Sequence, residues 1–316
     1  MAARTALHSK IDVVCIGGAT LDRAYRAIGA LAPETSNPAT ARTSFGGVAR
    51  NVCETLAQLG NVAALHSLIG ADAAGAALRD HLAELGVDAA GLRIHPGASS
   101  AEYAAVLDSC GDLAIGLAAM EIFDHFTIAD ASAALARQPR WIFADCNLPA
   151  PVLRHLIAAC RASDQKLAVD AVSAPKVLRL PGDCAGLDLL FLNRDEAAAL
   201  LGAHLPPPEA AATLRARGIA NVVLTLGAGG LVVATAAGVE RLPVVPARIA
   251  DATGAGDASI GTILSRLLAG DALADAARAG AHAAALTIAW PGSVRPDLAR
   301  ALAAALAGDR PDAPNA

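Results

Sequence analysis

The sequence predicts an α/β protein built on one large, mainly parallel β-sheet. Short apolar runs that suit buried strands alternate along the chain with segments of helical period, which is the pattern of consecutive strand–helix–strand units. The chain has 316 residues, of which 54% are hydrophobic and only 17% charged, so it can bury a large core. Length and composition allow one large domain with an appended lid, or two smaller domains.

The predicted elements follow one another along the chain. We expect strands at residues 11–16, 65–69, 141–144, 166–172, 187–192, 222–226 and 231–234. We expect helices at residues 48–59, 81–85, 151–162, 256–268 and 275–289.

Two regions, residues 20–45 and roughly 92–118, break this rhythm because polar and apolar positions alternate in them. They predict a small antiparallel sheet, or lid, packed outside the main one. Residues 307–316 contain two prolines and are expected to form a disordered tail, which leaves residues 1–306 as a single domain including the lid.

Composition argues against several functions. The net charge is −5, no basic block occurs, and only 3% of residues are aromatic, which argues against binding to a nucleic acid polymer. The sequence contains no apolar run of about 18 residues, the length that would predict a membrane span. The six cysteines form no CxxC pair and the eight histidines no HExxH motif, which argues against a Cys/His metal site. Residues 1–10 lack the apolar stretch of a signal peptide, so we expect a cytoplasmic protein.

The strongest local motif runs from Asp251 to Asp257 and leads directly into an apolar helix. The small residues Gly254, Ala255 and Gly256 let the backbone approach a ligand, and the free N–H groups of a helix start favour an anion. A carboxylate at Asp257, one turn inside, is useful beside an anion if it removes a proton from an attacking hydroxyl. The alternative, at about even odds on spacing alone, is an ordinary helix start capped by Thr253.

A second pattern is Gly46-Gly47 followed by Asn51 one helical turn later. Two glycines permit close backbone approach, and an amide there can hold a polyol hydroxyl. A capped helix after a tight turn is the ordinary alternative. The Rossmann fingerprint GxGxxG is absent both here and after the first strand, so a dinucleotide-binding fold is disfavoured.

Two further patterns follow predicted strands. Asn193 and Glu196 lie at a strand's carboxyl end and can hold a hydrated Mg²⁺ through its waters, although this pattern taken alone favours a capped helix start. Thr225, Gly227 and Gly230 fit either a nucleotide-binding loop or a hairpin.

In this order, the four motifs resemble those of the ribokinase-like carbohydrate kinases, the PfkB family, over about residues 11–300. The resemblance implies a Rossmann-like α/β domain with a β-sheet lid, a small-molecule sugar or nucleoside substrate, ATP and Mg²⁺ as cofactors, and often a homodimer formed through the lids. It also implies roles for the motif residues. They are Asp257 as catalytic base, Gly254, Ala255 and Gly256 as anion hole, Asn193 and Glu196 at the Mg²⁺–phosphate site, Thr225, Gly227 and Gly230 (with Asn193) at the nucleotide, and Asp22, Gly46, Gly47 and Asn51 at the substrate.

The chain departs from the family pattern at one position. The family usually has two threonines after the first Asp of the anion-hole motif, whereas this chain has Ala252-Thr253. A K⁺ or other monovalent cation site at Asp251 and Thr253 is therefore an open expectation. His282 lies near the position of a common adenine-pocket residue.

Three more stretches resemble the members of the family that phosphorylate pseudouridine: residues 36–38, 144–148 and 169–176. They place Asn37, Asn147, Ser173 and Lys176 in the expected substrate pocket. Amide, hydroxyl and ammonium groups suit a uracil-like base with two carbonyls and two N–H groups better than a bare sugar. The resemblance thus implies transfer of the ATP γ-phosphoryl group to the 5′-hydroxyl of pseudouridine. The alternatives are a ribokinase or other nucleoside kinase, or a sugar- or nucleoside-binding sensor without catalysis.

Overall fold

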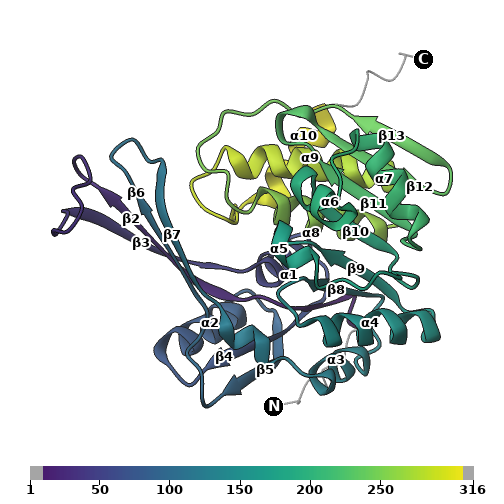
Figure 1. The fold of residues 1–316 in the computed structure, drawn as a ribbon, viewed down its shortest axis with the longest axis horizontal. Coiled ribbons are helices and arrows are strands. Elements are labelled where there is room, and N and C mark those ends of the chain that lie inside the picture. Colours follow the sequence, from purple (N-terminus) through teal and green to yellow (C-terminus); the bar gives the residue numbers. More distant parts are fainter. Residues whose placement is uncertain (1–9, 309–316) are drawn as a thin grey trace, which may run out of the picture.

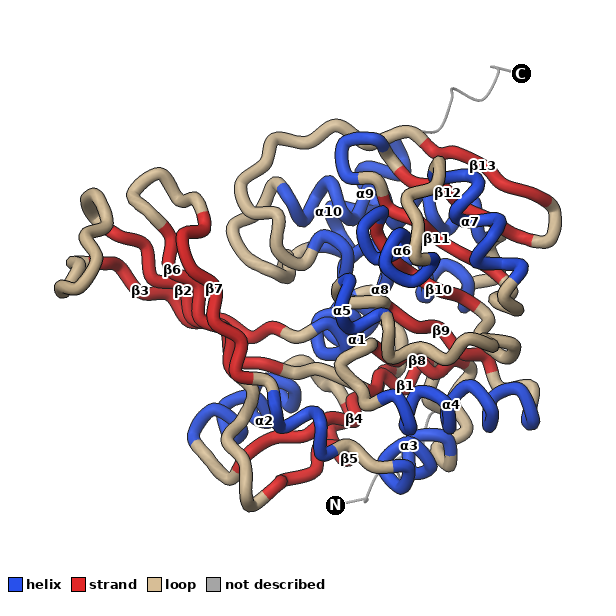
Figure 2. The backbone as a smooth tube through the Cα atoms, in the orientation of Figure 1, coloured by secondary structure: helices blue, strands red, loops and turns tan. Residues whose placement is uncertain are grey.

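The computed structural model describes residues 10–308 and contains two separate β-sheets (Figures 1 and 2). The large sheet has nine strands: β13 (Gly238–Leu242), β12 (Leu231–Thr235), β11 (Asn221–Thr225), β10 (Leu189–Asn193), β9 (Lys166–Asp170), β8 (Trp141–Asp145), β1 (Val13–Ile16), β4 (Ala63–Gly70) and β5 (Asp88–His95), in that order. All pairs are parallel except β11–β12 and β12–β13. The predicted mainly parallel α/β sheet is confirmed.

The helices and short helical turns cover this sheet. They are α1 (Val48–Gln58), α2 (Ala73–Glu84), η1 (Glu121–His125), α3 (Ile128–Leu135), α4 (Ala150–Ser163), α5 (Ala174–Val177), α6 (Arg194–Leu201), α7 (Pro207–Ala216), η2 (Gly227–Gly229), α8 (Ala255–Leu268), α9 (Leu273–Ile288) and α10 (Leu298–Gly308). No helix within residues 10–308 is long and apolar enough to cross a membrane.

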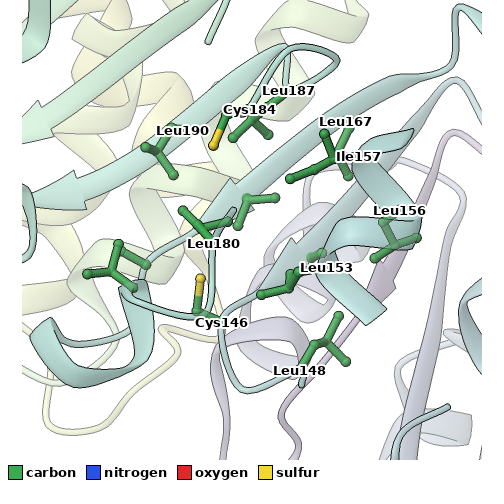
Figure 3. Packing of buried hydrophobic residues seen from close by; sticks show 14 of the residues in the cluster. Cys146, Leu148, Leu153, Leu156, Ile157, Leu167, Leu180, Cys184, Leu187 and Leu190 are labelled. Carbon is green, nitrogen blue, oxygen red and sulfur yellow. The ribbon is translucent and has the colours of Figure 1, made fainter. Parts of the chain in front are cut away.

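Each face of the large sheet carries its own hydrophobic core. Side chains of α3, α4, α6 and α7 pack on one face, and those of α1, α2, α8 and α9 pack on the other. Figure 3 shows part of the first core, where Leu153, Leu156 and Ile157 of α4 lie against the strands. Both faces are covered, so the central strands are continuously apolar, as expected for parallel strands.

The small sheet extends away from the body as a lid (Figure 1). Its strands are β3 (Ala39–Gly46), β2 (Thr20–Ala27), β6 (Glu102–Leu107) and β7 (Leu113–Ala119), in that order. The expectation of a purely antiparallel lid is wrong, because β2 and β6 run parallel. Residues 92–95 are also not part of the lid, since they pair with β4 in the large sheet.

One edge of the lid is strongly apolar and exposed. Leu113, Ile115 and Leu117 alternate along β7 and are 58%, 55% and 60% exposed. Such a strip suits burial against another surface. The homodimer through the lids remains a prediction.

Most predicted strands and helices are confirmed, with end shifts of one to three residues; β9 ends at Asp170 and α2 is longer than predicted, beginning at Ala73. The strands and α-helices that were not among the predicted elements are β5, α3, α5, α6, α7, β13 and α10, although a helix start at Asn193 was the stated alternative for α6. Helix α10 extends to Gly308, so it includes the first two residues of the predicted tail, and residues 309–316 lie outside the described residues.

The carboxylate of Asp145, at the end of β8, joins three segments of the body. Its Oδ2 accepts hydrogen bonds from the backbone N–H groups of Gly18 (2.8 Å) and Ala49 (3.0 Å), and its Oδ1 accepts one from Asn147 N (2.9 Å). Gly18 follows β1 and Ala49 lies in the first turn of α1. A Cβ on Gly17 would approach this carboxylate to 2.4 Å, so this turn requires glycine. Burial raises the pKa of Asp145, and the N–H donors oppose that rise.

We expect Asp145→Ala to lower the free energy of unfolding by about 2–5 kcal/mol, because it leaves three buried N–H groups without an acceptor. Asp108→Ala is the matched control. Asp108 Oδ1 also accepts three backbone N–H bonds, from Cys110, Gly111 and Asp112, but in an exposed lid turn where water can replace it. Its loss should stay within about 1 kcal/mol. Urea unfolding of the two variants measures the difference, and equal losses would contradict the role of Asp145.

Candidate active site

The predicted anion-binding turn precedes helix α8. Gly254 is the N-cap residue, with φ +76°, and no side chain caps the helix there. A Cβ on Gly254 would approach the carbonyl oxygen of Ser293 to 1.8 Å, so only glycine fits. The first N–H groups of the helix, at Ala255 and Gly256, have no carbonyl one turn earlier to bond. They can therefore donate hydrogen bonds to an anion. The alternative in which Thr253 caps the helix is wrong.

Asp257 lies half-buried in the first turn of α8. Its Oδ2 accepts a hydrogen bond of 2.6 Å from Asn51 Nδ2 in α1. Burial raises the pKa of Asp257 to about 6, against the lowering effects of the Asn51 hydrogen bond and the charge of Arg50. Near neutral pH this carboxylate is ionised yet basic enough to take a proton from a hydroxyl.

Asp22 and the two glycines meet where β2 and β3 join the body. Thr20 Oγ1 donates to Asp22 Oδ1 at 2.7 Å. A Cβ on Gly46 would approach Asp22 Oδ2 to 2.0 Å, and one on Gly47 would approach Gly18 O to 2.5 Å. The glycines therefore make room for the carboxylate and for the close start of α1. Burial raises the pKa of Asp22.

Asn147, Ser173 and Lys176 come together at the carboxyl ends of β8 and β9. Lys176 Nζ, in α5, donates to Asn147 Oδ1 at 2.5 Å, and Ser173 is the N-cap residue of α5. Burial lowers the pKa of Lys176. Val172, directly before Ser173, has φ +65°, a conformation that a β-branched residue rarely adopts. Strain of this kind is concentrated at functional sites.

The structure does not bring Asn37 to this group. Its side chain bonds within its own lid loop, donating to Ala32 O and Thr35 O and accepting from Ala32 N. The loop joins the outer ends of β2 and β3, about 20 Å along the strands from Asp22. A substrate role for Asn37 remains a prediction.

Asn193 and Glu196 form a reciprocal capping box at the start of α6. Asn193 Oδ1 accepts from Glu196 N at 2.9 Å, and Glu196 Oε2 accepts from Asn193 N at 2.7 Å. The interpretation of this pair as a capped helix start is therefore correct, but it does not exclude a role in holding Mg²⁺. Glu196 keeps its other carboxylate oxygen for a ligand, and burial raises its pKa.

A second carboxylate faces Glu196 from the end of β9. Burial, followed by the charges of Glu196 and Asp257, raises the pKa of Asp170 well above its usual value. No three His, Cys, Asp or Glu side chains among the described residues gather closely enough to hold a metal by themselves. Crowded carboxylates nevertheless suit Mg²⁺, which keeps several waters and binds through one or two carboxylates and substrate phosphates.

The Gly-rich turn after β11 is a hairpin, as the ordinary interpretation predicted. Gly227 and Gly230 have φ +57° and +83°, and a Cβ on Gly230 would approach Leu242 O to 2.2 Å. Thr225 pairs with Asn193 in the parallel sheet, so the hairpin and the capping box lie side by side. The predicted nucleotide residues therefore lie at the carboxyl ends of two neighbouring strands, β10 and β11.

Near this edge a groove of about 910 Å³ runs between α9 and the chain that follows β13. Its lining includes His282 on α9 and Val244, Val245 and Pro246 opposite. From Pro246 the chain continues to Asp251, whose Oδ1 accepts from Thr253 N at 2.9 Å. His282 therefore lines a groove large enough for a nucleotide base, and its place in an adenine pocket remains a prediction.

Three site residues were missed by sequence reasoning: Arg50, Asp145 and Asp170. Asp145 and Asp170 stand at the ends of predicted strands, which is a usable signal. Arg50 carried no signal, because a charged residue in a helix is normally exposed.

The described geometry comprises a helix start without a side-chain cap, a carboxylate in its first turn with a raised pKa, and polar side chains at the carboxyl ends of neighbouring strands. Residues 10–299 match the family model described as pfkB family carbohydrate kinase. The chain belongs to this family. As a pfkB family carbohydrate kinase it is a phosphotransferase with an alcohol group as acceptor.

The individual relatives have different named activities, so they do not identify one acceptor. The chain is similar to a pseudouridine kinase of Escherichia coli (28% identity, 92% of this chain and 95% of that protein) and to a 1-phosphofructokinase of Rhodobacter capsulatus (30% identity, 87% and 86%). Among solved structures it resembles an Arabidopsis thaliana ribokinase complexed with ribose and ATP (TM-score 0.79, 19% identity, 93% and 99%). The last likeness supports the fold alone.

We expect Asp257→Asn to lower kcat by about 10²–10⁴-fold, because the variant loses a positioned base. In the parent, kcat/KM should fall below about pH 6 as Asp257 becomes protonated, and this acid limb should vanish in the variant. Initial rates between pH 5 and 8 measure both effects. Activity within about threefold of the parent would refute the assignment of the base.

The same variant should not be less stable than the parent. The folded-state pKa of Asp257 is raised from 3.8 to about 6, so the parent loses stability as the pH rises through this range. Asp257→Asn avoids that loss. We therefore expect an equal or higher Tm than the parent at pH 7 and nearly equal Tm values at pH 4. A lower Tm at pH 7 would show that the activity loss comes from misfolding.

We expect Glu196→Gln to raise the Mg²⁺ concentration needed for half-maximal activity by at least about threefold while the KM for the acceptor changes less. Glutamine can keep the capping box, so α6 should remain intact. Asp195→Asn is the control, since Asp195 is an exposed first-turn acid of the same helix. Mg²⁺ titrations that superimpose for the parent and Glu196→Gln would contradict the metal role.

Proposed function

We propose that this kinase transfers the γ-phosphoryl group of ATP to the 5′-hydroxyl of pseudouridine, giving pseudouridine 5′-phosphate and ADP. The observation that carries the proposal is the Lys176–Asn147 hydrogen bond beside Ser173, on the sheet edge next to the base. The similarity to a pseudouridine kinase over 92% of the chain supports the same substrate.

The chemistry of a pyrimidine base fits this group of side chains. A uracil-like ring offers two carbonyl oxygens and two N–H groups. The Lys176 ammonium is a donor for a ring carbonyl, and the Ser173 hydroxyl can donate or accept. Asn147 is 4% exposed, and its amide oxygen is already held by Lys176. Bare ribose has no ring carbonyl or ring N–H to bond the Lys176 ammonium and the Ser173 hydroxyl, so it would gain less from this group of side chains.

The proposed reaction forms one bond to the γ-phosphorus and breaks another. The 5′-hydroxyl oxygen attacks the γ-phosphorus, the bond from that phosphorus to its bridging oxygen breaks, and ADP leaves. The hydroxyl proton passes to the carboxylate of Asp257. The N–H groups of Ala255 and Gly256 stabilise negative charge on the moving phosphoryl group, which supplies most of the rate in such reactions.

Magnesium fits the same site. Glu196, with Asp170 facing it, would hold the ion through water, and the ion would neutralise charge on the ATP phosphates. The residues of this chain keep the remaining tasks: Asp257 moves the proton and Thr225, Gly227 and Gly230 support the nucleotide. ATP as the phosphoryl donor is supported by membership of a carbohydrate kinase family.

Two other functions compete. A ribokinase or another sugar or nucleoside kinase would use the same base and anion hole, and the similarity to a 1-phosphofructokinase supports that possibility. A sensor without catalysis would have no use for Asp257 and its raised pKa. Acceptor preference separates the kinases from one another, and ATP turnover separates them from the sensor.

We expect kcat/KM for pseudouridine to exceed the values for uridine and ribose by at least about tenfold, because uridine lacks the N1–H that pseudouridine keeps. Lys176→Met should raise the KM for pseudouridine and reduce its advantage over ribose. Lys166→Met is the matched control, since Lys166 pairs with Asp188 at the opposite end of β9.

Initial rates with saturating ATP and with pseudouridine, uridine, ribose and fructose 1-phosphate as acceptors give these values. If uridine or ribose matches pseudouridine, the substrate proposal fails and the coarser kinase activity stands. If Lys166→Met and Lys176→Met behave alike, the pocket assignment fails.

A further inference from the structure

Arg50, in the first turns of α1, is a buried cation next to the catalytic machinery. It is only 2% exposed. Its Nη1 pairs with Glu54 Oε2, one helical turn further on, and its Nη2 donates to Asn51 Oδ1. Burial of a guanidinium is costly unless its donors are satisfied, so this residue has a specific purpose in the fold.

Arg50 fixes which way the Asn51 amide points. A guanidinium has donors and no acceptor, so it can only bond the amide oxygen. The Asn51 Nδ2 group must then face the other way, where it donates to Asp257 Oδ2 at 2.6 Å. With the amide reversed, two oxygens would face each other at Asp257. Arg50 therefore leaves Asp257 Oδ1 as the oxygen that can take a substrate proton.

The same guanidinium holds the end of the lid. Its Nε donates to Gly46 O at 3.1 Å and its Nη2 to Phe45 O at 2.6 Å. Phe45 O also accepts from Ser293 Oγ at 3.2 Å, and the Ser293 carbonyl lies against the anion-hole glycine, Gly254. The last residues of β3, the base and the loop behind the anion hole thus meet around one cation.

We propose that Arg50 is the positioning residue of this kinase: it orients Asn51 so that Asp257 is held in its reactive geometry, and it ties that geometry to the end of the lid. The inference rests on the proposed role of Asp257 as base. It does not depend on which alcohol is the acceptor.

The charges around Asp257 give the direction of the expected effect. Arg50 faces it from α1, Asp22 from β2, Asp145 from β8 and Asp170 from β9. Arg50 is the cation among them and lowers the pKa of Asp257, whereas the carboxylates raise it. On its far side Glu54 faces His81, whose Nε2 lies 3.5 Å from Glu54 Oε2. Loss of Arg50, and a reversed Asn51 amide, should both move the pKa of Asp257 upward.

The test replaces the pair together, as R50M/E54Q, so that no unpaired charge is left buried. We expect the ¹³C titration of the Asp257 carboxyl, assigned with D257N, to shift upward by about one pH unit. The acid limb of kcat/KM should move by the same amount, and kcat at pH 7 should fall at least about tenfold. The KM for ATP should stay within about twofold.

The matched control is R93M/D130N, in which an arginine likewise bonds a carboxylate and a backbone carbonyl, but on β5 and α3, away from the site. It should leave the titration of Asp257 and kcat unchanged. A fall in kcat without an upward shift of the Asp257 titration would overturn the proposal, because it would mark Arg50 as only structural. The titration needs no turnover, so it decides the role of Arg50 even if pseudouridine is not the acceptor.

If R50M/E54Q does not fold, R50K provides the test. Lysine keeps the charge but cannot bond Asn51, Phe45 and Gly46 at once. We expect the Asp257 titration to shift upward by less than in R50M/E54Q, because the charge is kept while the Asn51 amide is released, and kcat to be at least about fivefold lower. An R50K enzyme with the parent's kcat would overturn the proposal.

Discussion

The buried carboxylate of Asp145 is the contact on which the site depends. It satisfies the N–H of Gly18 after β1, that of Ala49 in α1 and that of Asn147 after β8. These three segments carry the entry to the lid, the residues that contact Asp257 and one side of the proposed base pocket. An ionised group is costly to bury, but here it replaces three separate acceptors that a loop of this kind would otherwise need.

The site concentrates negative charge where more negative charge must bind. Asp22, Asp145, Asp170, Glu196 and Asp257 all have raised pKa values, with burial as the first cause in each case. Within the described residues near Asp257, Arg50 and the helix start of α8 are the opposing features. Such a site is poorly suited to hold ATP without a cation. Burial, with the neighbouring carboxylates, keeps Asp257 basic, so the features that favour the proposed Mg²⁺ also favour the proposed base.

The sequence predicted the parts of this molecule that depend on local pattern. Apolar runs such as residues 187–192 identified the central strands, and the glycine turn before Asp257 identified the helix that binds an anion. Contacts between distant segments were not accessible in this way. The predicted helix over residues 48–59 places Glu54 one turn from Arg50, but nothing in the sequence indicates that Arg50 is buried against Phe45, because that contact depends on how β3 meets α1. The parallel pairing of β2 with β6 likewise depends on a long connection that periodicity does not describe.

Two of the connections between the lid and the body are short. Strand β2 starts four residues after β1 ends, and β3 ends one residue before Gly47, the N-cap of α1. No flexible linker separates the lid from the helix that carries Asn51. A shift of the lid would therefore reach the first turn of α1 through Gly46 and Gly47. The alignment of Asn51 with Asp257 thus depends on where the end of β3 lies, and a substitution in the lid could alter the base without touching it.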